Sequence, residues 1–172
     1  MNDKLIDFIK ESKIVLIGYQ YSINSIKVNE NIVSNFTYID IDEDDYNLNS
    51  INRDRKLNCV LNNANLPIID FYRLDLNNIR YDINLSDGFM VRAKIIRDVI
   101  QKLVKVVYNS KYKLILETNV MKLPSGDTSY SNYIEYAGGR TPLYACDLAI
   151  VIYDSMIEVV KNRYGETFKI DL

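Results

Sequence analysis

The sequence contains no histidine, no tryptophan and only two cysteines among its 172 residues. Without histidine, Ser–His and Cys–His nucleophile pairs and histidine-ligated metal sites are excluded. The two cysteines, Cys59 and Cys146, are too few for a zinc cluster or a disulfide framework. Sites built from carboxylates, amides, lysine and arginine remain possible.

Long apolar segments and linkers are also missing. No run of 18 apolar residues occurs, so no membrane span is expected. Only three prolines are present, and no linker or internal repeat divides the chain. We expect one domain over residues 1–172, with a short helix in 1–12 and a core in 13–172. The N-terminus does not resemble a signal peptide, so we expect a cytoplasmic protein, or a viral protein in the host cytoplasm or nucleus.

The charges nearly balance, with 21 Lys and Arg against 23 Asp and Glu, which gives a formal net charge of −2. Bulk attraction to nucleic acid or to an acidic membrane is therefore not expected. Any such binding must be local to one surface.

Short apolar runs alternate with helical patterns along most of the chain. Strands are expected at residues 13–17, 36–41, 66–71, 113–116, 147–153, 156–161 and 166–170, and helices at 3–11, 23–34 and 86–108. The alternation predicts an α/β fold with a mainly parallel central sheet flanked by helices, closed by antiparallel C-terminal strands. In such sheets ligands bind beyond the carboxyl ends of the strands.

The segment after the first strand has part of a phosphate-loop pattern, G-x-x-x-x-G-K-[ST]. Gly18 and Ser25 stand at its first and last positions, but Ile23 replaces the second glycine and Asn24 replaces the lysine. The second glycine lets the backbone wrap around phosphates, and the lysine supplies the positive charge that faces them. Both losses weaken the expected binding of a phosphate.

Acidic and amide side chains follow the next three strands. Residues 40–45 contain five acids, which could hold a divalent ion opposite a phosphate, although a solvated acidic loop is the alternative. The run that ends at Asp70 is similar to the strand whose aspartate coordinates Mg²⁺ in nucleotide hydrolases. Asn119 places an amide after the fourth strand.

Two further features are ambiguous. Lys161 and Arg163 lie two apart on a strand, so they could clamp a phosphate or protect an exposed sheet edge. Residues 121–140 are expected to form a long loop that could contact single-stranded DNA, because tyrosines stack on bases and cations hold phosphates. An ordinary loop or a protein interface is the alternative. The side chains concerned are Lys122, Tyr130, Tyr133 and Arg140.

Taken in order and spacing, residues 13–172 resemble the ATPase core of the RecA/DnaB superfamily of recombinases and hexameric helicases. The segment IVLIGYQYSINS stands at its phosphate loop, FTYIDIDEDDYN at its second strand and LPIIDFYRLDL at its Walker B strand. The segment MVRAKIIRDVIQKLVKVVYNSKYKLILETNV is similar to the helix and strand that lead to the sensor residue. YAGGRTPLYACDLAIVI and VVKNRYGETFKIDL are similar to the segment after the second DNA-binding loop and to the closing hairpin.

The resemblance implies a RecA-like, P-loop-type core and a role for each matched residue. Asp70 would be the Mg²⁺-water ligand, Ser25 the Mg²⁺-ligand hydroxyl and Asn119 the sensor. Either Asp42 or Glu43 would activate water. Gly18, Asn24 and Ser25 would be the vestige of the nucleotide site. Lys161 and Arg163 would reach a neighbouring subunit's γ-phosphate, and Lys122, Tyr130, Tyr133 and Arg140 would contact DNA.

The replacements at Ile23 and Asn24 predict a pseudo-ATPase with no resident ATP or Mg²⁺; if the chain is active, it is an ATPase. The expected function is that of an accessory subunit in DNA recombination or replication. It would dock on a RecA-like or helicase ATPase partner, or self-associate into an oligomer, and would also contact single-stranded DNA. The alternative is a structural or regulatory protein-interaction module that has lost both nucleotide and DNA binding.

Overall fold

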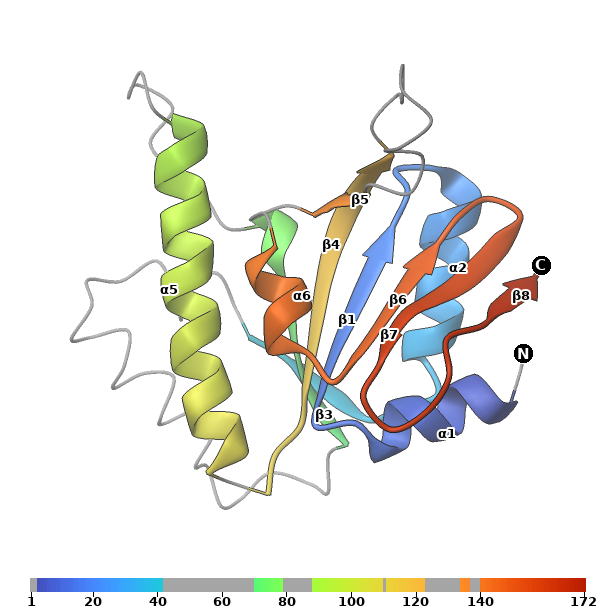
Figure 1. The fold of residues 1–172 in the computed structure, drawn as a ribbon, viewed down its shortest axis with the longest axis horizontal. Helices are drawn as coiled ribbons and strands as arrows, with labels where there is room; N and C mark the ends of the chain where they lie inside the picture. The colour runs from blue at the N-terminus through green and yellow to red at the C-terminus, as the bar shows by residue number, and fades with distance from the viewer. Residues whose placement is uncertain (1–2, 42–69, 79–87, 110, 123–133, 137–139) are drawn as a thin grey trace.

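The computed structural model describes residues 3–41, 70–78, 88–109, 111–122, 134–136 and 140–172 (Figure 1). The strands are β1 (Ile14–Tyr19), β2 (Tyr38–Asp40), β3 (Phe71–Asp75), β4 (Leu114–Lys122), β5 (Ile134–Tyr136), β6 (Leu148–Ile152), β7 (Met156–Asn162) and β8 (Lys169–Asp171). The helices are α1 (Asp3–Glu11), α2 (Ile23–Val33), the short 3-10 helix η1 (Leu76–Asn78), α5 (Gly88–Tyr108) and α6 (Thr141–Ala145).

The sheet is mixed and mostly parallel, which confirms the expected α/β class. Its strand order is β2-β3-β4-β1-β6-β7-β8, with β5 paired to β4. The first five strands of that order run parallel, and β7 and β8 are antiparallel additions. The carboxyl ends of β1, β3, β4 and β6 therefore meet at one side of the sheet, the carboxyl edge, and their starts meet at the opposite amino edge (Figure 1).

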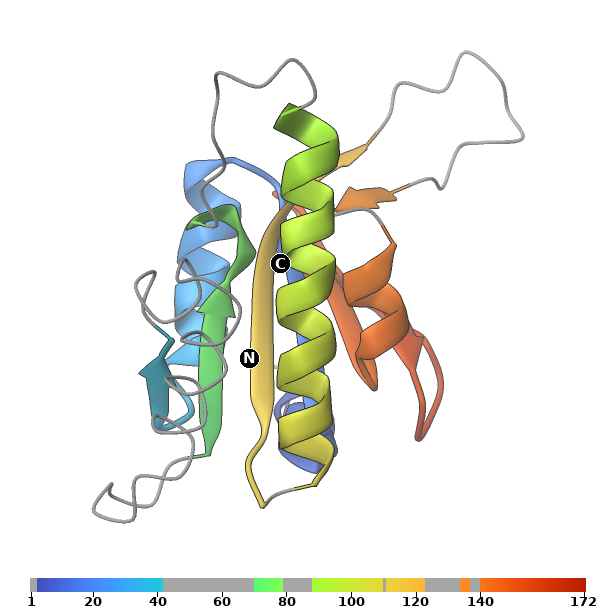
Figure 2. The ribbon, with the colours of Figure 1, turned by 90° about the vertical axis from the view of Figure 1, so that its left-hand side faces the viewer.

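Helices cover both faces of the sheet because the parallel strands alternate their apolar side chains between two cores. Ile14 and Leu16 of β1 pack in the core that contains the buried face of α5. Val15 and Ile17 pack in the other core, against α1 and α2. Figure 2 shows α5 on one side of the sheet and α2 on the other. None of the described helices is both long and apolar enough to cross a membrane.

The third strand corrects one expectation. We expected it to end on Asp70, but β3 begins at Phe71, so Asp70 precedes the strand at the amino edge; residues 66–69 lie outside the described part. The Asp70 carboxylate accepts hydrogen bonds from the backbone nitrogen of Thr37 (2.8 Å) and from its hydroxyl (2.9 Å). These two bonds lower the pKa of Asp70 and tie the start of β3 to the segment before β2.

The segment expected to be a long loop contains further secondary structure. β4 continues to Lys122, and β5 pairs with it in antiparallel register, Val120 opposite Tyr136. The apolar pattern is too short at β5 to signal a strand, since only three residues form it.

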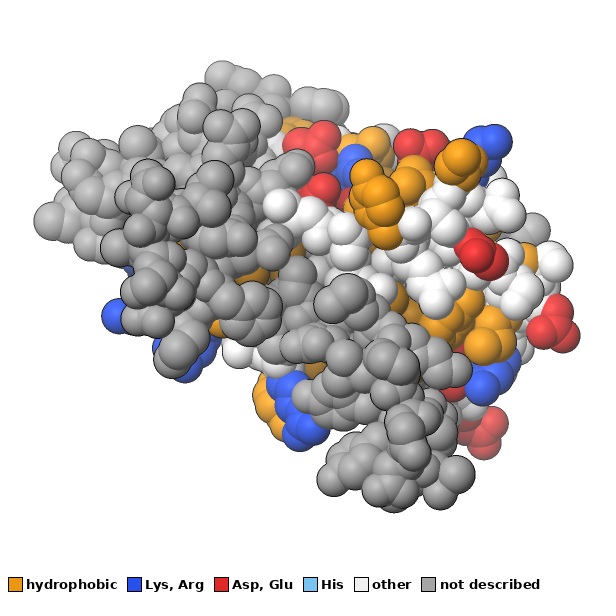
Figure 3. All heavy atoms as spheres, turned by 90° about the horizontal axis from the view of Figure 1, so that it is seen from above, with side chains coloured by type: hydrophobic (Ala, Val, Ile, Leu, Met, Phe, Trp, Pro, Cys, Tyr) orange, Lys and Arg blue, Asp and Glu red, His pale blue; other side chains and the backbone are white. Residues whose placement is uncertain are grey.

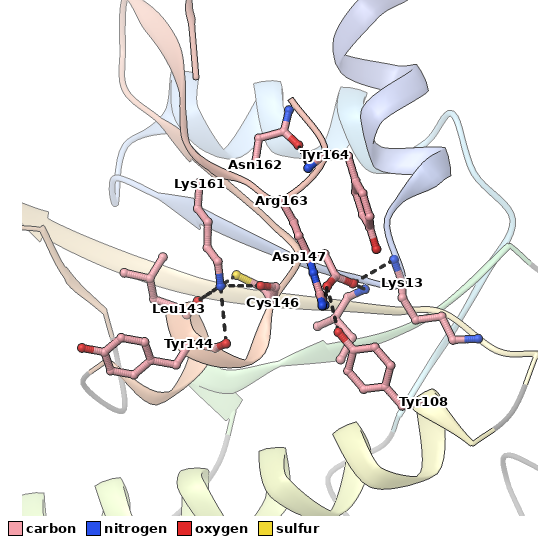
Figure 4. Close-up of polar contacts among 11 residues, drawn as sticks. Lys13, Tyr108, Leu143, Tyr144, Cys146, Asp147, Lys161, Asn162, Arg163 and Tyr164 are labelled. Carbon is pink, nitrogen blue, oxygen red and sulfur yellow. Dashed lines mark hydrogen bonds and ion pairs between the residues drawn. The ribbon is translucent and has the colours of Figure 1, made fainter. Parts of the chain in front are cut away.

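One buried carboxylate accepts hydrogen bonds from several segments at the amino edge. Asp147, which directly precedes β6, is 1% exposed. It accepts hydrogen bonds from the backbone nitrogens of Lys13 (3.2 Å) and Ile14 (3.1 Å), from the Tyr108 hydroxyl (2.8 Å) and from Arg163 Nη1 (3.1 Å), as Figure 4 shows. Burial and the bond to Asp147 raise the pKa of Tyr108 to about 12, so its hydroxyl stays a donor. The carboxylate thus joins β1, α5 and the end of β7.

Replacing Asp147 tests this arrangement. Asp147→Ala removes an acceptor shared by four donors, and we expect a loss of about 3–5 kcal/mol in the free energy of unfolding. The measurement is urea unfolding followed by circular dichroism. Asp171→Ala, at an exposed residue of β8, is the matched control and should change little. Equal, small effects of both substitutions would contradict the role given to Asp147.

Candidate functional site

The candidate site lies at the carboxyl edge, where β1 passes into α2. Gly18 lies in β1, and Ser22 is the N-cap residue of α2 with an extended backbone. The Ser22 hydroxyl accepts a hydrogen bond from the backbone nitrogen of Ser25 (3.1 Å), which satisfies one of the free N–H groups of the first turn. The strand and the helix expected on either side of the phosphate-loop pattern are therefore present.

The turn between β6 and β7 brings a carboxylate to the same place. Asp154 accepts hydrogen bonds from the hydroxyls of Ser22 and Ser25, the latter over 3.3 Å. β6 runs beside β1, and Gln20 N donates to Ile152 O (3.0 Å), so the two segments stay adjacent beyond the strands. A negative charge at a helix N-terminus is stabilised by the helix dipole and the free N–H groups. The chain thus supplies its own anion where a phosphate would be held.

Contacts within the chain occupy the residues that the resemblance assigns to ATP and Mg²⁺. The Ser25 hydroxyl, which the resemblance assigns to Mg²⁺, is fully buried and bonded to Asp154. A phosphate would displace the carboxylate or be repelled by it, and Asn24 adds no positive charge to compensate. Ile23, in place of the second glycine, is 74% exposed. Among the described residues, no group of three or more acidic or cysteine side chains could hold a metal ion.

A buried ion pair lies between α2 and the sheet. The Glu117 side chain is 1% exposed and accepts from Arg73 Nη2 (2.8 Å) and from Asn29 Nδ2 (3.2 Å). Arg73 also lies 3.5 Å from Asp40 and over the ring of Tyr38. Burial raises the pKa of Glu117, and the bonds from Arg73 and Asn29 offset this only in part.

A second polar group connects the ends of β1, β3 and β4. Asn77 Nδ2 donates to Asp75 (2.7 Å) and to the Tyr19 hydroxyl (3.3 Å), and Asn77 Oδ1 accepts from the backbone nitrogen of Asn119 (3.0 Å). Burial and the charges of Asp75 and Glu117 raise the pKa of Tyr19 to about 12. Asn119 lies beside the end of β1 but inside β4, which continues to Lys122 rather than ending before Asn119. Its buried Oδ1 has no hydrogen-bond partner in the described part of the chain.

Sequence reasoning missed Arg73, Asp75, Asn77 and Glu117. The available signal was Glu117 itself, a charged residue in the apolar strand KLILETN, because a buried carboxylate needs a partner. Its partner Arg73 is 44 residues away, and no local pattern connects the two.

The structure separates several of the expected site residues. Ser25 and Asn119 lie at the carboxyl edge, whereas Asp70 lies at the amino edge. Asp42, Glu43, Tyr130 and Tyr133 lie outside the described residues. Lys122 is the last residue of β4, and Arg140 directly precedes α6.

Lys161 and Arg163 also lie at the amino edge, and both have partners within the chain (Figure 4). A register shift between Ala149 and Ile150 places Lys161 opposite Ala149. The three N–H groups of its ammonium can serve the three carbonyl oxygens around the end of α6, those of Leu143 (2.8 Å), Tyr144 (3.4 Å) and Cys146 (2.6 Å). Arg163 pairs with Asp147, while its side chain stays 61% exposed.

The pH dependence of stability tests the environment of Glu117. Its raised pKa means that the folded protein holds this proton more tightly than the unfolded chain does. Stability is therefore lost as the pH rises from 4.5, the ordinary value, through the folded pKa. Glu117→Gln does not titrate, so its free energy of unfolding should improve relative to the native protein between about pH 4 and about pH 7.

Urea unfolding at the two pH values measures this difference. Glu30→Gln, at an exposed position on α2, is the control and should show no such change. The stability of Glu117→Gln relative to the native protein should rise with pH. If this difference in the free energy of unfolding stays constant or falls as the pH rises, burial does not dominate at Glu117.

Comparison with known proteins adds nothing to this geometry. No family model matches the chain, and no curated protein matches it either. The functional interpretation therefore rests on the contacts described above and on the resemblance in motif order.

Proposed function

We propose that the chain is a degenerate RecA-like core, a pseudo-ATPase that serves as an accessory subunit in DNA recombination or replication. In this proposal it docks on a RecA-like or helicase ATPase, or on further copies of itself, and contacts single-stranded DNA. The strand order supports the proposal, because β4, which carries Asn119, lies between β1 and β3. A sensor at that place would be adjacent to a phosphate held after β1.

The observation that carries the pseudo-ATPase part is the contact of Asp154 with Ser22 and Ser25. An active phosphate loop needs an open helix N-terminus and a lysine beside it. Here the helix end is occupied by a carboxylate, and Asn24 stands at the lysine position. Two independent changes therefore act against phosphate binding at the same point.

The alternative, an interaction module without nucleotide or DNA binding, has one observation in its favour. Lys161 has three carbonyl partners and Arg163 has a carboxylate partner, so packing within the chain accounts for both cations. A reach toward a neighbour's phosphate would require Lys161 to leave those partners.

Restoring the phosphate loop tests the proposal. We expect the native protein to show no saturable binding of Mg²⁺-ATP by calorimetry and no ATP hydrolysis. Asn24→Lys combined with Asp154→Asn removes the blocking charge and supplies a cation, so the double variant should bind ATP at least about tenfold more tightly than the native protein. The matched control is Asn31→Lys with Asp171→Asn, which makes the same charge change at exposed positions away from the loop.

Equal gains in the two double variants would mean that net charge, not the loop, governs binding. Mg²⁺-dependent hydrolysis by the native protein that Ser25→Ala abolishes would contradict the pseudo-ATPase proposal outright.

Docking on an ATPase has its own test. The immobilised native chain should retain a RecA-like or helicase ATPase from an extract of its source cells, identified by mass spectrometry, and should change the rate of ATP hydrolysis by that enzyme. Retention of neither class, together with no binding of DNA, would favour the interaction module.

A further inference from the structure

The amino edge of the sheet gathers positive charge in a chain whose net charge is −2. Besides Lys161, whose ammonium is bonded to carbonyl oxygens around the end of α6, six cations lie on the segments that meet there: Lys10, Lys13, Lys105, Lys111, Lys113 and Arg163. Four carboxylates accompany them, those of Glu11, Asp70, Asp147 and Glu166, and Asp147 is buried. We call these cations, together with Tyr108 and Tyr164, the amino-edge surface.

Hydrogen bonds connect part of this surface across the sheet. The Lys113 ammonium donates to the carbonyl oxygen of Lys10, and the backbone nitrogen of Leu114 donates to the Lys13 carbonyl (2.9 Å). The backbone nitrogen of Lys13 in turn donates to Asp147, which holds Arg163. Lys10, Lys13, Lys113 and Arg163 are therefore connected along the amino edge from β3 to β7, a width of about 20 Å at the usual strand spacing.

Two partly exposed tyrosines lie among these cations. Tyr108 is 45% exposed and Tyr164 is 57% exposed, and Figure 4 shows both beside Arg163, Asp147 and Lys13. The Tyr108 ring is fixed by its hydroxyl bond to Asp147, so it needs little ordering on contact with a ligand. Aromatic faces beside lysine and arginine are the combination that holds the bases and the backbone of an unpaired strand.

The opposite edge differs in character. Figure 3 looks onto the carboxyl edge, where the described residues show Lys and Arg side chains scattered among apolar, acidic and uncharged polar ones. Tyr21 is 84% exposed there, but the adjacent anion position is filled by Asp154. Charge complementarity therefore favours the amino edge for a polyanion.

We propose that the amino-edge surface binds single-stranded nucleic acid, with its lysines on the phosphates and Tyr164 stacked on a base. This inference adds a binding surface to the proposed function. It rests on that function only for the choice of single-stranded nucleic acid as the ligand. It places the contact on a surface other than the segment 121–140. The surface is local, so the negative net charge of the whole chain reduces the affinity without preventing binding.

Fluorescence anisotropy with a fluorescein-labelled oligothymidylate tests the proposal at several salt concentrations. The native protein should bind at low salt and lose affinity as salt rises. Lys10→Glu with Lys111→Glu, both at exposed positions, should weaken binding at least about tenfold and reduce the salt slope by about 1.4, the value for two phosphate contacts on a single strand. Tyr164→Ala should weaken binding several-fold with an unchanged salt slope, because stacking releases no counterions.

The matched control is Lys27→Glu with Lys94→Glu, which makes the same charge change at exposed positions on α2 and α5. It should keep the affinity within about twofold. Equal weakening of binding in the two double variants would overturn the proposal. Polyglutamate that competes as strongly as unlabelled oligonucleotide would also overturn it, because the ligand would then be an acidic protein. Thermal unfolding of each variant checks the fold, and Lys10→Gln with Lys111→Gln replaces the charge reversal if that variant unfolds.

The outcomes also separate this inference from the proposed function. Suppose that the double variant Lys122→Glu, Arg140→Glu loses oligonucleotide binding while the double variant Lys10→Glu, Lys111→Glu keeps it. The binding site is then not the amino-edge surface, and the proposed DNA-directed function stands. If the native protein binds no oligonucleotide at low salt, the inference fails, and the ATP titration still decides the pseudo-ATPase proposal independently.

Discussion

The carboxylate of Asp147 is the contact on which the arrangement of the sheet depends. It lies in the interior at the amino edge and joins the start of β1 to α5 and to the end of β7. A buried charge is tolerated only when several donors surround it, and here four donors do so. By fixing β1 beside β6 at their starts, this contact also determines which segments meet at their carboxyl ends.

The functional consequence appears at that other end. Because β6 runs parallel to β1, the turn after β6 reaches the start of α2, and Asp154 meets Ser22 and Ser25 there. One carboxylate therefore stabilises the fold, and a second lies at the start of α2, where we propose that it excludes a phosphate. The strand order that would serve a nucleotide site is present, and in the proposed function a contact within the chain replaces the chemistry of that site.

Local sequence patterns predicted those elements that local interactions define. The apolar spacing in residues 3–11 and the pattern in residues 23–34 gave helices close to α1 and α2, and the run after Lys13 gave β1. The start of β3 was misplaced, because the apolar run before Asp70 hid the strand Phe71–Asp75, whose partly buried Arg73 pairs with Glu117 from a distant segment. Asp154 was missed because its partner Ser25 is 129 residues away, and no periodicity encodes such a contact.

We propose that Asp154 occupies the position at the start of α2 that a phosphate loop would give to an anion. A crystal structure of the protein grown with saturating Mg²⁺-ATP tests it most directly. The account predicts electron density for the Asp154 carboxylate against the hydroxyls of Ser22 and Ser25, with no phosphate at the start of α2. A nucleotide phosphate bound at Ser25, with Asp154 turned away, would contradict it.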